Sequence, residues 1–254
     1  VQKNIENEKE KAALKHQLLE KENENLKKDE LLALSELKML QNQINPHFLF
    51  NTLESIRIKA ILNGDDTVAD MVKILAKMFR TVLESDKKNY HVQDEMENIR
   101  SYIQLQNIRF DNVITLEEEI EPEIYQAKIM SILFQPVVEN GFKYGSRESG
   151  VPIRISICGR MEKEKQMVFT IADNGVGMSK ERLAEVREEL SREQSRVLSE
   201  QQEIDKEQQK TSHRIGLKNI AERIRLRYGS EGSLNILSSD ENGTVIEIRI
   251  PYTG

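Results

Sequence analysis

Hydrophobic residues recur along the first part of the chain at the spacing of helices. Up to about residue 111 they return every three or four positions, which is the spacing of one helix face. Such stripes predict a helix over residues 67–84 and another that starts with the acidic pair Asp94 and Glu97. Residues 1–34 place an apolar residue at every seventh position, which predicts a weak coiled coil or, alternatively, a solvated helix with a narrow apolar edge.

The second part of the chain, from about residue 112, has the pattern of a sheet with helices. The predicted strands occupy residues 113–120, 151–159, 166–173 and, as a hairpin closed by an Asn-Gly turn, 233–251. The predicted helices occupy residues 129–144 and 217–228. A mixed sheet with helices on one face is a two-layer α/β sandwich. The predicted fold class is therefore α followed by α/β.

These patterns divide the chain into three predicted parts. Residues 1–34 form an N-terminal helix, and residues 35–111 form a helical unit that cannot bury all its apolar surface alone, which favours self-association into a bundle. Residues 112–254 form the α/β part. Within it, residues 179–213 are mostly polar and contain no glycine or proline, which predicts a mobile lid.

Composition and charge exclude several classes of function. The formal charge is −6, and the basic residues are interspersed with glutamate, which disfavours a nucleic-acid partner. The single cysteine, Cys158, excludes an intrachain disulfide and fits a reducing compartment. No apolar run is long enough to span a bilayer, and the start at Val1 inside a charged helix suggests a piece of a longer protein.

The segment "DNGVGM", residues 173–178, directly follows a predicted strand. Asp173 can accept a hydrogen bond from an exocyclic amine, and Gly175 and Gly177 would let a flat ring or a phosphate approach the backbone. Asp-Asn-Gly is also an ordinary turn, which is the alternative interpretation.

Two further motifs flank the predicted lid. In "QPVVENGFKYG", Asn140 offers a neutral oxygen to Mg²⁺, and Lys143 lies on the same helix face, where it could meet a phosphate. A frayed helix end is the alternative for this motif. In "RIGLKNIAERI", Gly216 opens a helix whose first-turn amides are available to an anion.

The segment "QINPHFLFNTLESIR", residues 43–57, places a histidine directly after a proline. Pro46 should kink or loosen the helix and present the imidazole of His47 outward. A neutral imidazole is a nucleophile at neutral pH, and Asn51 on the same helix face could orient it or a hydrolytic water. For His47 in isolation, a structural histidine is the alternative.

Together these segments resemble the sensor histidine kinases related to YesM and LytS. The Asn-Pro-His-Phe-Leu-Phe-Asn string resembles their phosphoacceptor segment, and the three later motifs resemble the N, G1 and G2 boxes of the Bergerat ATP-binding fold. The resemblance implies a homodimer with a helical phosphoacceptor domain, ATP and Mg²⁺ as cofactors, and a cognate response regulator as partner. It also implies that the chain is the cytoplasmic portion of a membrane receptor whose sensor segment is absent from this sequence.

The resemblance carries specific roles to this chain. It implies that His47 is phosphorylated by ATP and passes the phosphoryl group to a response-regulator aspartate, that Asn140 binds Mg²⁺, and that Asp173 reads adenine. The other implied nucleotide contacts are Lys143, Tyr144, Gly175, Gly177, Arg214, Gly216 and Leu217.

The sequence departs from the family pattern in a few places. Arg214 replaces a usual glycine, which would stiffen the lid hinge or bring a guanidinium to phosphate, and Tyr144 replaces a common histidine. Phe48 follows His47 where many sensor kinases have an acidic residue, so the general base stays open, with Glu139 as the nearest candidate.

Two other functions compete with the kinase interpretation. A clamp-type ATPase needs a glutamate one helical turn before Asn140, but Pro136 stands there and cannot act as a base. The second alternative is a degenerate kinase that works as a nucleotide-binding switch, a scaffold or a phosphatase.

Overall fold

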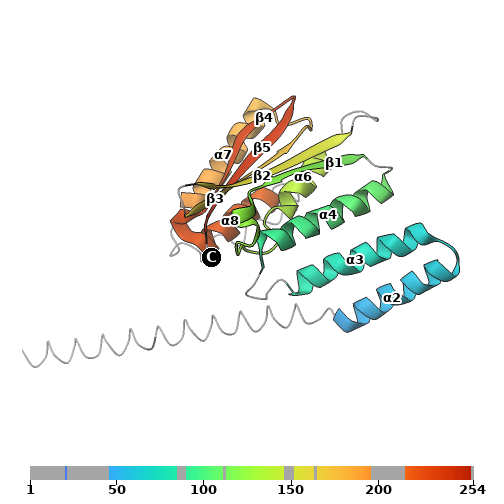
Figure 1. Ribbon diagram of the computed structural model, residues 1–254. Coiled ribbons are helices and arrows are strands. Elements are labelled where there is room, and N and C mark those ends of the chain that lie inside the picture. The colour runs from blue at the N-terminus through green and yellow to red at the C-terminus, as the bar shows by residue number, and fades with distance from the viewer. Residues whose placement is uncertain are drawn as a thin grey trace, which may run out of the picture. The chain divides into compact units, whose positions relative to one another are not determined.

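The structure is a computed structural model that describes residues 21, 46–84, 90–110, 113–145, 152–162, 165–195 and 215–252 (Figure 1). By their contacts, residues 1–53 and residues 54–254 form two units, which are described separately. Apart from Lys21, the predicted coiled coil of residues 1–34 lies outside the described residues, and so does Arg214.

Helix α2 spans Pro46–Leu62 and carries the motif that contains the histidine. A proline fits the first turn of a helix because its missing N–H would have no partner there. Since residues 41–45 are not described, the kink predicted at Pro46 falls at the border of the described residues and stays a prediction.

Helices α3 (Asp66–Glu84) and α4 (Val92–Arg109) pack against each other. The turn before α3 contains Gly64 at φ 73°, and Asp65 Oδ1 accepts a hydrogen bond from the N–H of Val68 at 3.0 Å. Helix α4 starts two residues before the predicted Asp94. Its first turn is instead closed by Asp94 Oδ2, which accepts from the backbone N–H of His91 at 2.9 Å.

A five-stranded mixed sheet forms the centre of the second unit, in the order β1-β2-β3-β5-β4 (Figure 1). The strands are β1 (Ile114–Ile120), β2 (Ile153–Glu162), β3 (Gln166–Asp173), β4 (Ser233–Asp240) and β5 (Gly243–Pro251). Strands β1 and β2 are parallel, and the other neighbours are antiparallel. The predicted strands and the predicted hairpin are thus confirmed.

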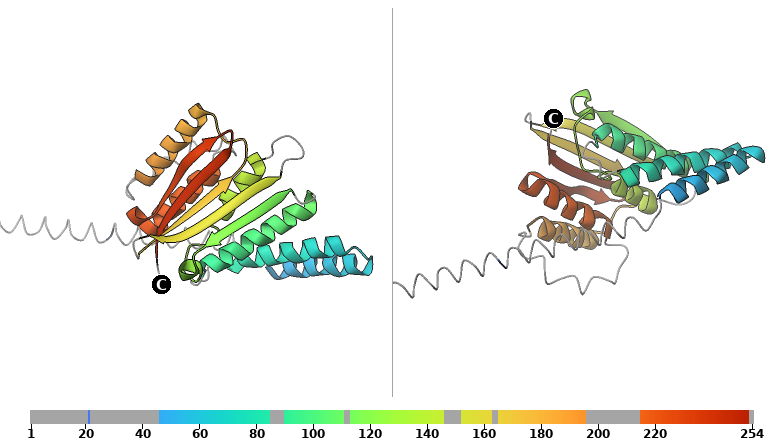
Figure 2. Two further views of the ribbon diagram at one scale, coloured as in Figure 1. Left: turned by 45° about the horizontal axis from the view of Figure 1, so that its top comes forward. Right: turned by 90° about the horizontal axis from the view of Figure 1, so that it is seen from below.

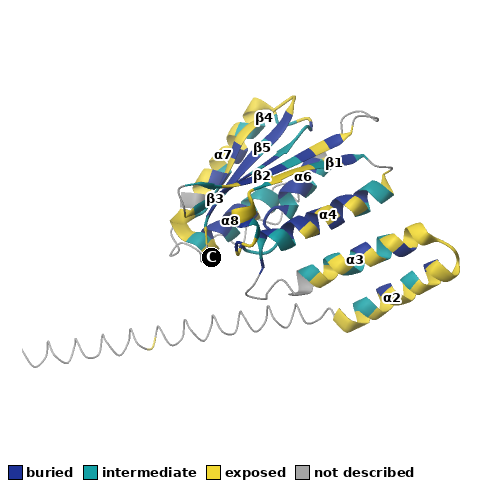
Figure 3. Cartoon of the chain, in the orientation of Figure 1, coloured by how far each residue is buried: buried dark blue, intermediate teal, exposed yellow. Residues whose placement is uncertain are grey.

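A layer of helices covers one face of this sheet (Figure 2). Besides α4, it consists of α6 (Gln135–Gly145), α7 (Lys180–Ser195) and α8 (Ile215–Tyr228). The short helices α5 (Pro122–Tyr125) and η2 (Gly229–Glu231) connect elements. Along β2, buried residues that face the helices alternate with less buried ones (Figure 3). This is the predicted two-layer sandwich.

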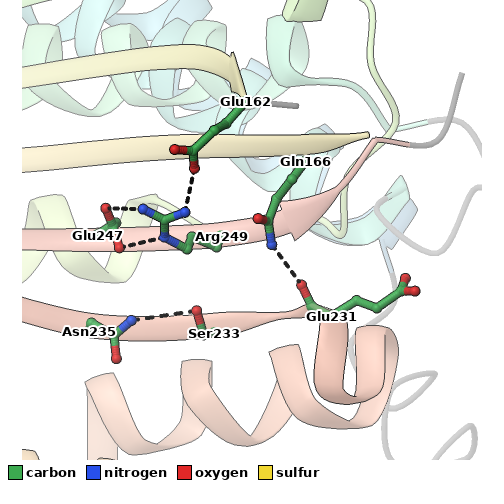
Figure 4. Close-up of polar contacts among 7 residues, drawn as sticks. All are labelled: Glu162, Gln166, Glu231, Ser233, Asn235, Glu247 and Arg249. Carbon is green, nitrogen blue, oxygen red and sulfur yellow. Dashed lines mark hydrogen bonds and ion pairs between the residues drawn. The ribbon is translucent and has the colours of Figure 1, made fainter. Parts of the chain in front are cut away.

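The opposite face of the sheet is polar. Arg249 on β5 pairs with Glu247 of its own strand at 2.7 Å and with Glu162 on β2 at 2.5 Å (Figure 4). At the start of β3, Gln166 Nε2 donates to the backbone carbonyl of Glu231 at 3.4 Å. These contacts lie across the sheet from the apolar core.

Two predicted elements differ from the structure. Helix α6 starts at Gln135 and not at residue 129, because the preceding backbone is irregular, with Ile132 at φ 54°, and because Pro136 belongs in a first turn. Residues 180–195, within the predicted lid, form α7, whose Val186 and Leu190 are buried in the core. The lid prediction remains untested for residues 196–214, which are not described.

Helix α4 shares the core of the α/β part. Val92, Met96 and Ile99 are completely buried in the same apolar cluster as Phe134 and Phe169. A domain boundary near residue 111, as the sequence predicted, would therefore divide one core. Among the described residues, no helix has both the length and the apolar character needed to cross a membrane.

Candidate functional site

A cavity of about 370 Å³ opens between the helix layer and the strands β3 and β5. This volume falls within the range of small-molecule sites. The cavity brings together five residues that the sequence singled out, namely Asn140, Asp173, Gly177, Gly216 and Leu217. They come from α6, the end of β3, the loop after β3 and the start of α8, so the fold assembles in one place three motifs that are distant in the sequence.

One carboxylate oxygen of Asp173 is bound by backbone N–H groups of the protein. Its Oδ1 accepts hydrogen bonds from the backbone N–H of Gly175 at 2.8 Å and of Thr244 at 3.3 Å. Burial raises the pKa of Asp173, while these two donors oppose the rise. Within the described part of the chain no donor contacts Oδ2, which leaves that oxygen for a ligand.

Glycines create the space around Asp173. A Cβ on Gly141 of α6 would lie 3.1 Å from the Cβ of Asp173, so a side chain there would press on the carboxylate. A Cβ on Gly177 would lie 1.9 Å from the backbone oxygen of Asp240, and its φ is 63°. Gly177 is therefore required by the close approach of the β4–β5 hairpin, besides any contact with a ligand.

Two neighbouring residues of α6, Asn140 and Glu139, carry side-chain oxygens, and of these two only Asn140 lines the cavity. A Cβ on Gly216 would lie 3.2 Å from Asn140 Nδ2, which shows how closely α6 and α8 approach each other. Glu139 is half-buried, and its Oε1 accepts a hydrogen bond from Gln135 Nε2 at 2.7 Å.

Other residues that the sequence predicted for the site do not line the cavity or lie partly outside the described residues. Lys143 is exposed on the last turn of α6 and is not part of the cavity wall. Gly175 is buried and contributes its N–H to Asp173. Tyr144 lies in α6, but its side chain is outside the description, as is all of Arg214.

His47 and Asn51 lie together on the first turns of α2, and both are exposed. Asn51 Nδ2 is 3.2 Å from Nδ1 and 3.4 Å from Nε2 of His47. The amide can therefore donate to the ring, as the four-residue spacing predicted. An exposed imidazole with a neighbouring donor is accessible to a reactant.

Comparisons with known proteins decide the family. The family model described as "Histidine kinase" matches residues 35–114, and "Histidine kinase-, DNA gyrase B-, and HSP90-like ATPase" matches residues 126–254. The chain belongs to the histidine kinase family. Its sequence is 34% identical to sensor histidine kinase YesM of Bacillus subtilis over 90% of this chain and 35% of that protein. It is 31% identical to sensor protein kinase HptS of Staphylococcus aureus over 86% of this chain and 38% of that protein.

The chain thus spans somewhat more than a third of the length of these curated relatives. Among solved structures, the histidine kinase domain from the blue-light activated histidine kinase of Erythrobacter litoralis EL346 matches 81% of this chain and 93% of its own. The identity is 13% and the TM-score is 0.45, so this likeness adds nothing to the family assignment.

The cavity of this histidine kinase includes residues that the sequence analysis missed. Thr244 and Ile246 of β5 line it, and so do Arg182 and Leu190 of α7. The β5 residues carried no motif, because alternation predicts only that they face the core. The residues of α7 were assigned to a mobile lid. Gly141 stood inside a quoted motif, and its position beside Asn140 was a signal that could have been used.

Proposed function

We propose that this histidine kinase transfers the γ-phosphoryl group of ATP to His47 and then to an aspartate of a response regulator. The single observation that carries the proposal is the cavity in which Asp173, Asn140 and Gly216 meet, on a chain that also exposes His47 beside Asn51. Family membership supports ATP as the substrate.

The adenine ring of ATP fits the inner part of the cavity. Asp173 Oδ2 would accept a hydrogen bond from the exocyclic amine, and Val137 and Ile246 supply apolar walls for the ring. Leu217 also lines the cavity, and Gly216 lies in the first turn of α8, where backbone N–H groups and the helix dipole favour phosphate.

Asn140 fits a Mg²⁺ ion that travels with the nucleotide. A single neutral side-chain oxygen is an ordinary contribution to an ion that takes most of its ligands from phosphates and water. Among the described residues no cluster of three His, Cys, Asp or Glu side chains is placed to hold a metal, which agrees with such a shared ion. When bound, Mg²⁺ neutralises charge on the phosphates.

The residues of the chain then position the transfer. A ring nitrogen of His47 attacks the γ-phosphorus, the new N–P bond forms, and the bond to the bridging oxygen breaks as ADP leaves. Asn51 orients the ring by donating to it. Glu139 takes the proton that the phosphorylated imidazole releases. The aspartate of the response regulator next attacks the same phosphorus, the N–P bond breaks, and the ring takes back a proton, which returns His47 to its neutral form.

The proposed setting is a homodimer at a membrane receptor. The helical part exposes large apolar side chains, including Phe48 at 69% and Leu62 at 79%, which a second copy would cover. We propose that the part of the receptor that senses the stimulus lies in the longer protein, as the length of the relatives suggests.

The proposal is tested by incubating the chain with Mg²⁺ and γ-labelled ATP. We expect acid-labile, base-stable label on wild type, no label on His47→Gln, and full label on His91→Gln, a matched histidine at the start of α4. Binding of a fluorescent ATP analogue should be the same in all three proteins, because neither substitution touches the cavity.

Two outcomes would overturn the proposal. Wild type that binds nucleotide but never carries label would favour the nucleotide switch or the phosphatase. Label that persists on His47→Gln would assign the acceptor to another residue.

A further inference from the structure

A row of buried polar residues follows the face of α4 that meets α6. Glu95, Asn98, Tyr102 and Gln106 recur at helical spacing and are exposed by 8% or less. Burying a polar side chain costs stability unless its hydrogen bonds are replaced. Four such residues on the buried face of one helix therefore point to a function beyond packing.

Glu95 fixes the position of the first turn of α6. Its Oε1 accepts from the backbone N–H of Phe134 at 2.8 Å and of Gln135 at 3.1 Å. Its Oε2 accepts from the N–H of Ile132 at 2.9 Å and the hydroxyl of Tyr90 at 2.8 Å. The beginning of α6 is thus tied to α4 by one carboxylate.

Asn98, one turn further along α4, extends this tie to a side chain of the site. Asn98 Nδ2 donates to Gln135 Oε1 at 2.5 Å, and Gln135 Nε2 donates to Glu139 Oε1 at 2.7 Å. The three residues form a chain of hydrogen bonds in which each donor is an amide. Because Asn98 engages the oxygen of Gln135, the amide of Gln135 must turn its N–H toward Glu139.

Of the side-chain atoms of Asn98, only the amide nitrogen makes a hydrogen bond to another described residue, and ordinary packing does not explain a buried amide with this arrangement. Its Oδ1 is buried without a hydrogen-bond partner in the described part of the chain. A leucine of similar size would fill the site without that unsatisfied oxygen. The amide is therefore retained at a cost, and the contact that it does make is the one to Gln135.

We propose that Asn98 and Gln135 are positioning residues that hold the carboxylate of Glu139 oriented for the phosphoryl transfer. Because Gln135 donates to Oε1 of Glu139, that oxygen is engaged and the rotation of the carboxylate is restricted. The inference rests on the proposed function, because it gives Glu139 the role of proton acceptor. It adds that α4, which packs against α3, sets the orientation of that acceptor.

The test measures the rate of His47 phosphorylation at saturating ATP and, separately, the Kd of a fluorescent ATP analogue. Gln135→Met removes both hydrogen bonds at nearly constant shape. Gln135→Glu keeps an acceptor for Asn98 and replaces the donor to Glu139 with a second carboxylate, whose charge repels that of Glu139. Gln104→Met, on the exposed face of α4, is the matched control.

We expect both Gln135 variants to phosphorylate His47 on the order of tenfold more slowly, with Kd changed less than about twofold. The control should behave as wild type. The double variant Gln135→Met/Glu139→Gln should be no slower than Glu139→Gln alone, because the relay acts only through Glu139. If Gln135→Met fails to fold, Gln135→Glu still gives the result.

Three outcomes would overturn the inference. One is a normal rate in Gln135→Glu, and another is a double variant whose loss equals the product of the two single losses. The third is a normal rate in Glu139→Gln, which would remove the role of Glu139 while leaving phosphorylation of His47 intact. Failure of the proposed function is distinct, since wild type would then carry no label or the label would persist on His47→Gln.

Discussion

Glycines at two turns of this kinase have the same backbone conformation but different surroundings. Gly177 has φ 63° and Gly64 has φ 73°, both in the left-handed region that other residues adopt at a cost. At Gly64 nothing lies within 4 Å of where a Cβ would stand, whereas at Gly177 the backbone oxygen of Asp240 is 1.9 Å away. A substitution at Gly64 therefore tests backbone strain alone, whereas one at Gly177 tests backbone strain together with a steric clash.

We expect Gly64→Ala to lower the free energy of unfolding by about 1 kcal/mol, the cost of the left-handed backbone alone. Gly177→Ala should cost more than about 3 kcal/mol, since the loop after β3 must move away from the β4–β5 hairpin, and ATP binding should be lost with it. Urea unfolding measures both. Equal losses in the two variants would contradict the steric explanation.

Asp173 illustrates a conflict between stability and binding. Burial raises the pKa of Asp173 in the folded state. Above this raised pKa the ionised carboxylate lowers the stability of the fold. Below the pKa of the unfolded state it has no effect, because the group is protonated in both states. We expect Asp173→Asn without nucleotide to be more stable than wild type at neutral pH, with the difference shrinking on acidification. Its affinity for an ATP analogue should fall at least about tenfold. Urea unfolding of both proteins at several pH values measures the difference in stability. A wild type that is more stable than Asp173→Asn at neutral pH would contradict this expectation.

At the scale of elements, the start of α6 is the clearest failure of the sequence pattern. The strands and the β4–β5 hairpin were predictable because alternation and an Asn-Gly turn are local signals. Residues 129–134 carry apolar residues at helical spacing, yet Glu95, distant in the sequence, takes up the N–H groups of this segment. No local pattern indicates that a glutamate of α4 will be buried there.

We expect Glu95→Ala to destabilise the fold by more than about 3 kcal/mol, because it leaves the hydroxyl of Tyr90 and three backbone N–H groups without an acceptor. Glu97→Ala on the same helix removes only an exposed pair with Lys77 at 3.4 Å and should change stability by less than about 0.5 kcal/mol. Denaturant midpoints of the two variants compare them directly. A loss in Glu95→Ala as small as in Glu97→Ala would disprove the anchoring role.

At the scale of the whole molecule, the motifs predicted five of the residues that line the cavity, but not which elements bury α4. Asn140, Asp173 and Gly216 belong to recognisable motifs, so their meeting could be anticipated. The placement of α4 could not, because an amphipathic helix pattern says that one face is buried and not which partner buries it. The apolar stripe of α4 fits a bundle as well as a sheet.

We expect a fragment of residues 90–254 to fold cooperatively and to bind an ATP analogue, because it retains α4 in the core. A fragment of residues 112–254, cut at the boundary that the sequence suggests, should fail to show a cooperative thermal transition. It lacks Met96 and Ile99, which are completely buried, and it also lacks Glu95. A well-folded shorter fragment would show that α4 is dispensable.

The edge strand β1 determines whether the sheets of two neighbouring copies of this kinase can join edge to edge. It pairs with β2 on one side only. On its other side the Asn107 side chain bonds the N–H and the carbonyl of Ile114, and the exposed run Glu117, Glu118 and Glu119 follows along the strand. Two sheets held close by paired helices would otherwise be able to join edge to edge into a continuous ribbon. Charged side chains on this edge strand, where Glu118 pairs with Arg100 and Glu117 with Arg154, disfavour such aggregation and keep each ATP-binding domain separate.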